Sequence, residues 1–139
     1  MKNTNNICND MKKSLLTLSM LVCAMIAYAK PPQLAVESLF DGTYNGKKGI
    51  SITTVKSQNN YFREIEVRED NPALVRKIDK LIEKDAERAS NFTETYTENR
   101  HERVFQISNN GKQINIGATR YLNKPRFELF IQGTPEAFK

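Results

Sequence analysis

The 139-residue sequence contains no tryptophan, one histidine and two cysteines. Both cysteines, Cys8 and Cys23, precede residue 30, so a chain cleaved after Ala29 contains no cysteine. Disulfides, thiol nucleophiles and cysteine-ligated metals are then excluded together. His101 is the single histidine, and no G-x-S-x-G motif is present, so serine hydrolase chemistry has almost no support. We predict no cofactor and no metal.

The positive charge is modest and dispersed. The formal net charge is +5 and the pI is about 9.2, but acidic and basic residues are interspersed along the chain. Nucleic-acid-binding proteins usually concentrate their basic residues, so nucleic acid is an unlikely partner on this pattern. The length fits one domain, and we predict a single α+β domain over residues 30–139, large enough to build its own core.

The N-terminal segment has the pattern of a signal peptide. Met11-Lys12-Lys13 precedes an uncharged run over residues 14–29, which ends in Ala27-Tyr28-Ala29. A basic start, a short apolar stretch and a small-x-small site predict cleavage after residue 29. The run is shorter than the roughly 20 residues that span a bilayer, so no stable membrane anchor is expected. Residues 1–29 are therefore predicted to be a signal peptide of a periplasmic or secreted protein, with Met11 as an alternative start.

A second interpretation of the leader is a lipoprotein signal. Leu21-Val22-Cys23-Ala24 resembles a lipobox, in which the cysteine becomes lipidated. A lipobox has a small residue immediately before the cysteine, whereas Val22 is β-branched and larger. Lipidation at Cys23 stays the minor alternative.

One segment has a clear helical period. Leu74, Ile78, Leu81, Ile82 and Ala89 form one stripe of a 3.6-residue repeat. Asn71 is a favourable N-cap and Pro72 fits the first helical position, where no backbone N–H is needed. We predict a long helix over 72–90, with its charged face in solvent.

The segments around this helix alternate with a period of two, which indicates strands. A short helix is expected over residues 32–40. The strand candidates are 50–55, 63–68, 92–98, 102–108, 113–119 and 126–132. The predicted order is α-β-β-α-β-β-β-β, an antiparallel sheet with the long helix packed on one face.

Three two-residue turns set the predicted strand register. They are Asn99-Arg100, Asn110-Gly111 and Asn123-Lys124, of which Asn-Gly is the favoured hairpin dipeptide. The first turn pairs Phe92 with Ile107. Together the three turns place the apolar residues on one face, because a one-residue slip would scatter them. The core under the helix is predicted to contain Phe105, Ile107, Ile114, Ile116, Leu129 and Ile131.

The same turns define a row on the opposite face of the sheet. The row runs through Thr95, Val104, Gly117 and Phe130, and we predict it to be a partner-binding face. Two alternatives remain open. Phe130 could simply cover the missing side chain of Gly117, or the first helix, through Leu34, Leu39 and Phe40, could cap the face. The binding interpretation requires Phe130 to be partly exposed.

Other polar residues fit structural roles better than catalytic ones. Glu64 and Glu66 share a strand face and are expected to be solvated. His101 is expected at the surface, where it lacks partners for acid–base or metal chemistry. Glu94, Tyr96 and Arg103 are expected to form a buried polar cluster on the inner face.

The leader, residues 34–40 followed by Gly49-Ile50-Ser51-Ile52, and the element order resemble the small exported domains of unknown function of Bacteroides-type bacteria. The resemblance implies no catalytic residues.

We therefore expect a non-enzymatic exported envelope protein that binds a protein, peptide or glycan, in an oligomeric state that the sequence leaves open. A small periplasmic hydrolase-like enzyme is one alternative. The other is a module for anionic polymers or membrane surfaces, using Lys47, Lys48, Arg120, Lys124 and Arg126.

Overall fold

The computed structural model describes residues 33–139, which form one compact unit. The predicted signal peptide and Cys23 lie outside the described residues. Two short 3₁₀ helices, one α-helix and six strands follow one another in this order: η1 (Ala35–Phe40), β1 (Ile50–Lys56), β2 (Tyr61–Val67), α2 (Pro72–Ala86), β3 (Asn91–Tyr96), β4 (Arg100–Asn109), β5 (Lys112–Tyr121), β6 (Phe127–Gly133) and η2 (Pro135–Phe138). Among residues 33–139, no helix is long and apolar enough to cross a membrane.

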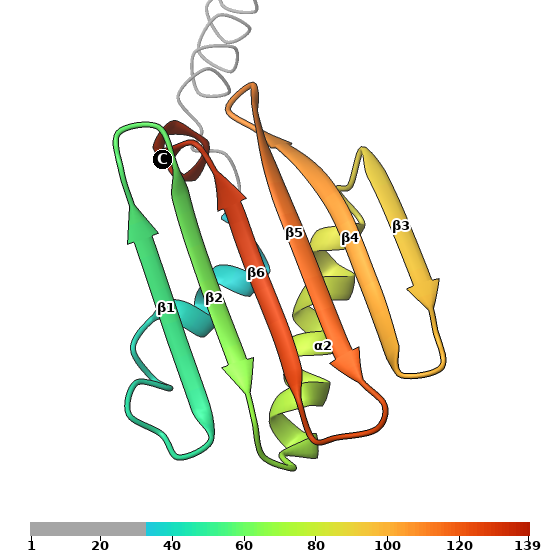
Figure 1. The fold of residues 1–139 in the computed structure, drawn as a ribbon. Helices are drawn as coiled ribbons and strands as arrows, with labels where there is room; N and C mark the ends of the chain where they lie inside the picture. Colours follow the sequence, from blue (N-terminus) through green and yellow to red (C-terminus); the bar gives the residue numbers. More distant parts are fainter. Residues whose placement is uncertain (1–32) are drawn as a thin grey trace, which may run out of the picture. The chain divides into compact units, whose positions relative to one another are not determined.

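The strands form one antiparallel sheet in the order β1-β2-β6-β5-β4-β3. Figure 1 shows this sheet in front and α2 and η1 behind it, so both helices lie on one face. The predicted class, α+β with an antiparallel sheet, is confirmed. We call the face that carries the helices the inner face and the opposite one the outer face.

The inner face and α2 enclose the core. Leu74, Ile78 and Ile82 of the helix are buried at 5, 0 and 1% exposure. Opposite them, every predicted sheet residue of the core is buried: Phe105, Ile107, Ile114, Ile116, Leu129 and Ile131. Because side chains alternate between the two faces of a strand, these apolar residues all lie on the inner face, against the helix.

Asp85 connects η1 to α2. Its side chain is 2% exposed and accepts the backbone N–H groups of Ala35 at 2.8 Å and Val36 at 2.9 Å. Leu34, Val36 and Leu39 then join the same core as the helix. The alternative that this first helix caps the outer face is therefore wrong, because its apolar residues pack on the inner face.

The long helix ends at Ala86, four residues earlier than predicted. The N–H groups of Arg88 and Ala89 donate to carbonyls three residues back, a tighter turn that ends the α-helix. Ser90 then donates its N–H to Gln106 O at 2.9 Å, which brings the chain into the sheet. The helix start agrees with the prediction, since Asn71 Oδ1 accepts Leu74 N–H at 3.1 Å.

Two of the three predicted turn registers are confirmed. Asn110 and Gly111 both have positive φ, at 54° and 67°, and Ile107 lies opposite Ile114. The β5–β6 register also agrees, with Ile116 opposite Ile131.

The β3–β4 register is wrong by two residues. Phe92 lies opposite Phe105 instead of Ile107, and the turn residues are Glu98-Asn99. The Thr97 hydroxyl donates to Arg100 O and accepts Arg100 N–H, both at 3.2 Å, so it closes the turn one residue early. A shift of two residues leaves the side chains on their predicted faces, which explains why the predicted core residues are buried although this register was wrong.

Candidate binding surface

The registers arrange the outer face in rows that cross the sheet. The amide row contains Asn91, Gln106, Asn115 and Gln132 and continues through Phe62 and Val55. Beside it, the apolar row contains Thr93, Val104, Gly117, Phe130, Glu64 and Thr53. Next comes the carboxylate row, with Thr95, Glu102, Thr119, Glu128, Glu66 and Ser51. The arginine row closes the face with Arg100, Tyr121, Arg126 and Arg68.

The structure brings three of the four predicted site residues together. Val104, Gly117 and Phe130 are direct neighbours in the apolar row. Thr95 is not their neighbour, because the two-residue register shift puts Thr93 opposite Val104. Thr95 lies opposite Glu102 in the carboxylate row.

Phe130 lies over Gly117 and remains partly exposed. A Cβ built on Gly117 would overlap the Cε1 and Cζ atoms of Phe130, so the ring occupies the space of the absent side chain. The Phe130 ring also stacks on Phe62, with centroids 6.1 Å apart and planes at 22°. Val104 on the other side of Gly117 is 48% exposed. Phe130 therefore covers Gly117 and is also partly exposed, as the binding interpretation requires.

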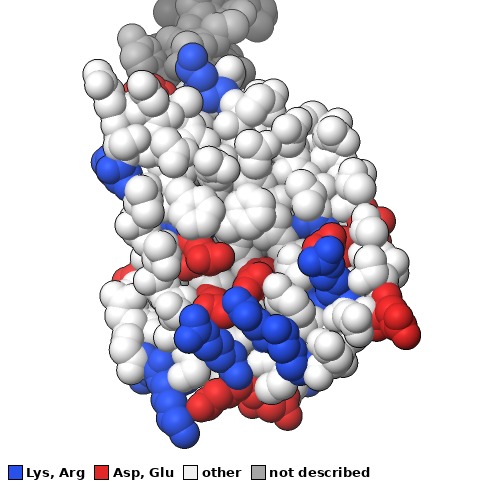
Figure 2. All heavy atoms as spheres, in the orientation of Figure 1, with Lys and Arg blue, Asp and Glu red and all other residues white. Residues whose placement is uncertain are grey.

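The carboxylate and arginine rows are joined by ion pairs. Arg126 Nη2 lies 2.8 Å from Glu66 Oε1 and 2.5 Å from Glu128 Oε1, and Arg68 Nη2 lies 2.7 Å from Glu66 Oε2. Arg100 pairs with Glu102 at 3.1 Å. Figure 2 shows red and blue residues interleaved over the lower part of this face, with an uncharged area above them.

Glu66 is not the solvated residue that the sequence predicted. It is 8% exposed, and the hydrogen bond from Arg68 holds its pKa below the ordinary value. Burial, followed by the charge of Glu128, raises the pKa of Glu64 instead. The two glutamates do share a face, but Glu66 is fixed as a carboxylate between two arginines.

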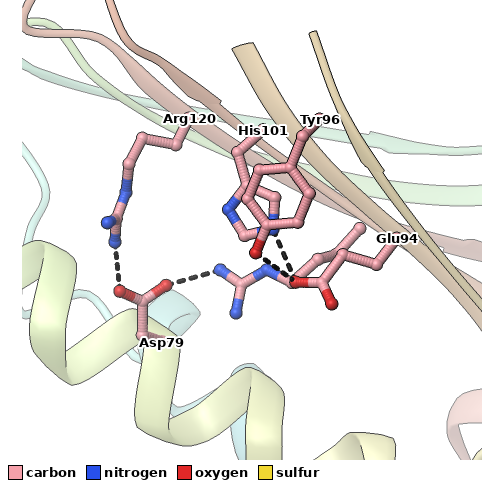
Figure 3. A network of polar contacts seen from close by, with 6 residues as sticks. Asp79, Glu94, Tyr96, His101 and Arg120 are labelled. Carbon is pink, nitrogen blue, oxygen red and sulfur yellow. Dashed lines mark hydrogen bonds and ion pairs between the residues drawn. The ribbon is translucent and has the colours of Figure 1, made fainter.

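Glu94, Tyr96 and Arg103 were predicted to form a buried cluster on the inner face, but Glu94 and Tyr96 are exposed. Arg103 lies opposite Glu94 on the neighbouring strand, and the hydrogen bonds of the cluster form two adjacent groups, one around Asp79 and one around Glu94 (Figure 3). Arg103, whose side chain is 10% exposed, donates from Nη2 to Asp79 Oδ1 at 2.5 Å. Arg120 pairs with the other Asp79 oxygen. The helix thus binds β4 and β5 through one carboxylate between two arginines.

His101 completes the second group. Glu94 Oε1 lies 2.6 Å from His101 Nε2 and accepts the Tyr96 hydroxyl at 3.1 Å. The Tyr96 ring stacks on the imidazole, with centroids 4.1 Å apart and planes at 5°. His101 was expected at the open surface, but Tyr96 covers it and its side chain is 14% exposed. The contact with His101 lowers the pKa of Glu94.

A pocket of about 220 Å³ lies beside the arginine row and is lined by Arg120, Lys124 and Arg126. Arg120 is paired with Asp79 and Arg126 with Glu66 and Glu128, while Lys124 lies 4.5 Å from the Tyr121 ring centroid.

Lys47 and Lys48 do not line this pocket, and Lys48 pairs with Glu69 at 3.5 Å. Three of the five predicted basic residues are therefore brought together, and two of these three are paired with carboxylates. Within residues 33–139, no group of three His, Cys, Asp or Glu side chains is placed to hold a metal ion.

Sequence patterns missed Phe62, Asp79 and the arginine row. The alternation in β2 does place Phe62 on the face of Glu64, but only the β2–β6 pairing brings it to Phe130. That pairing spans about 65 residues of sequence and has no local turn to reveal it. For Asp79, the available signal was its position beside the apolar stripe, next to Ile78.

These features define a small α+β domain with one helix-covered sheet face and one polar and aromatic face. A comparison with known protein families shows the family to which this domain belongs. The chain belongs to the family of unknown function DUF6108, which matches residues 22–123. The predicted identity as a domain of unknown function is thereby confirmed, while export and a Bacteroides-type origin stay predictions. No curated protein and no solved structure matches the chain.

Proposed function

We propose that this chain is an exported, non-enzymatic envelope protein that binds a partner protein through the outer face of its sheet. The observation that carries the proposal is the apolar row. Val104 is 48% exposed, Phe130 is half-buried over Gly117, and no element of residues 33–139 covers either side chain. An apolar centre with a polar rim is the usual anatomy of a protein interface.

The neighbouring rows favour a protein over the peptide or glycan alternatives. Aromatic and arginine side chains are enriched at protein interfaces and dominate their binding energy. Arg126 and Arg68 are already held by Glu66, so little side-chain entropy remains to be lost when a partner docks on them. The amide row supplies hydrogen-bonding groups on the opposite side, with Gln106 donating to Asn115 at 2.9 Å.

The non-enzymatic part of the proposal rests on how the titratable groups are engaged. His101 is stacked under Tyr96 and bonded to Glu94, and Glu66 is paired with two arginines. A general acid or base needs a free lone pair or proton directed at a substrate.

The binding proposal is tested by site-specific photo-crosslinking in intact cells. A photoreactive residue at Val104 should crosslink a defined envelope protein. The same residue at Lys80, which is exposed on the helix, should not. Binding of the identified partner to the purified chain should fall at least tenfold for Val104→Glu and stay unchanged for Lys80→Glu, which places a glutamate on the other face. Equal crosslinking from both positions, or full affinity of Val104→Glu, would refute the binding face.

Export has a separate test. The intact mass of the chain from the cell envelope should correspond to a first residue of Lys30. A lipid-modified chain that begins at Cys23 would establish the lipobox alternative instead, and a chain that retains residues 1–29 in the cytoplasm would refute export.

A further inference from the structure

The second feature of interest is the edge of the sheet formed by β3, shown in yellow at the right of Figure 1. Every residue of this strand is exposed, including Phe92 at 46% and Tyr96 at 69%. The helix covers neither of its faces. An edge strand presents unpaired backbone groups, which are a template for another strand.

The hydrogen bonds to β4 identify these unpaired groups. Thr97 N–H donates to Arg100 O at 2.9 Å, so Thr97 and Arg100 form a bonded pair. Bonded and non-bonded pairs alternate in an antiparallel ladder. The backbone N–H and C=O groups of Phe92, Glu94 and Tyr96 therefore point away from β4, toward solvent.

The sequence of β3 has only one of the devices that usually protect an edge, an inward-pointing charge. Such strands carry lysine, proline or a bulge, but Asn91–Tyr96 contains none of these and is rich in threonine and aromatic residues, which favour strands. Its one charge, Glu94, is held over the inner face by His101 and Tyr96. The other edge strand, β1, ends in Lys56 and follows the left-handed Gly49.

We propose that a second copy of this chain pairs with β3 in an antiparallel, two-fold arrangement centred on Glu94. Phe92 then lies opposite Tyr96 of the second copy, and Thr93 lies opposite Thr95. Aromatic pairs and threonine pairs are both favourable across strands. Three bonded pairs supply about six backbone hydrogen bonds. This inference is independent of the proposed function, because it uses the edge of the sheet and leaves Val104 and Phe130 uncovered.

The centred register also brings the two Glu94 side chains together. Like charges directly opposite each other are destabilising, although His101 partly compensates each carboxylate in its own chain. A register shifted by two residues in either direction places Phe92 opposite Glu94 or Glu98 of the second copy and loses the aromatic pairs. The centred register therefore predicts that removing the charge strengthens the dimer.

The test uses the chain as the cell processes it, in sedimentation velocity over a concentration series from about 10 μM to about 1 mM. The wild type should shift from monomer to dimer. Glu94→Pro should remain monomeric, because proline removes an N–H that faces outward and breaks no bond to β4. Glu94→Thr keeps that N–H and should dimerise up to about fivefold more tightly.

Thr54→Pro is the matched control on the other edge. Ser57 N–H donates to Asn60 O at 2.8 Å, so by the same alternation the N–H of Thr54 points away from β2. This variant should dimerise like the wild type. Loss of the dimer in Thr54→Pro, its persistence in Glu94→Pro, or a wild type that stays monomeric throughout the series would each overturn the proposal.

Hydrogen exchange provides a measurement that needs no variant. In the wild type, exchange of the Phe92, Glu94 and Tyr96 amides should slow as the concentration rises, while that of Thr54 should not change. Equal rates for the β3 amides at low and high concentration would contradict the paired edge even if Glu94→Pro failed to fold.

Discussion

Gly117→Ala tests the packing on which the candidate face depends. The added methyl group would overlap Cε1 and Cζ of Phe130 and lie 3.1 Å from its Cδ1. The backbone of β5 is fixed by ladders on both sides, to β4 and β6. The Phe130 ring must therefore swing away from the sheet, toward solvent or across Phe62.

The loss of stability has an upper bound. The ring can give up no more than its whole packing energy, which is about 3–5 kcal/mol for a fully buried phenylalanine. Because Phe130 is only half-buried, we expect Phe130→Ala to destabilise the fold by about 1.5 kcal/mol. Replacing a strand glycine with alanine recovers about 0.5–1 kcal/mol. Gly117→Ala alone should thus destabilise by about 0.5–1 kcal/mol.

A double-mutant cycle isolates this contact. In the Phe130→Ala background the methyl group meets no ring, so Gly117→Ala should stabilise the fold by about 0.5–1 kcal/mol. Urea unfolding, followed by circular dichroism, gives the four free energies, and the coupling should be about 1.5 kcal/mol. If Gly117→Ala had the same effect in both backgrounds, Phe130 would not occupy the space over Gly117, and the account of the apolar row would be wrong.

Two further predictions concern the buried carboxylates. Asp85→Ala leaves one buried and one partly buried backbone N–H group of η1 without an acceptor and should destabilise the fold by about 3 kcal/mol in urea unfolding. Glu83→Ala on the exposed side of the same helix should change the free energy of unfolding by less than about 0.5 kcal/mol, and similar values for both variants would refute the role of Asp85. Arg68 lowers the pKa of Glu66 below 4.5, so the stability from Glu66 is complete above that value and is lost as the pH falls through the lowered pKa. Glu66→Gln should therefore flatten the acid side of the stability profile relative to Glu64→Gln, and an unchanged acid slope would contradict the pairing.

The sequence predicts those parts of the fold that depend on local patterns. The helix start follows from Asn71 and Pro72, and the β4–β5 register follows from Asn110-Gly111, because each of these signals acts within a few residues. The predicted position of the β3–β4 turn was wrong for an equally local reason. The Thr97 hydroxyl competes with Asn99 for the position of the turn, and apolar alternation cannot detect a shift of two residues.

The candidate site was predictable on one half of the sheet only. Val104, Gly117 and Phe130 lie on three strands joined by consecutive turns, so their alignment follows from turn lengths. Phe62 joins them through the β2–β6 pairing, whose two strands are separated along the chain by α2, β3, β4 and β5. Long-range pairings depend on the whole core, and no segment of the sequence specifies them alone.

The edge and the face affect each other through the register. In a dimer centred on Glu94, Thr93 of one copy meets Thr95 of the other, so the apolar row of each copy continues into the carboxylate row of its neighbour. The two apolar rows would run end to end, offset by one row, on a continuous face of twelve strands. A partner with two equivalent sites could engage both copies, and the second contact would be intramolecular and therefore stronger than its intrinsic affinity. Glu94→Pro should then weaken the binding of such a two-site partner without changing the affinity of each site for one copy of the chain. Val104→Glu should lower that affinity at least tenfold and leave the dimer intact. The two variants thus separate the assembly of the face from the recognition that the face performs.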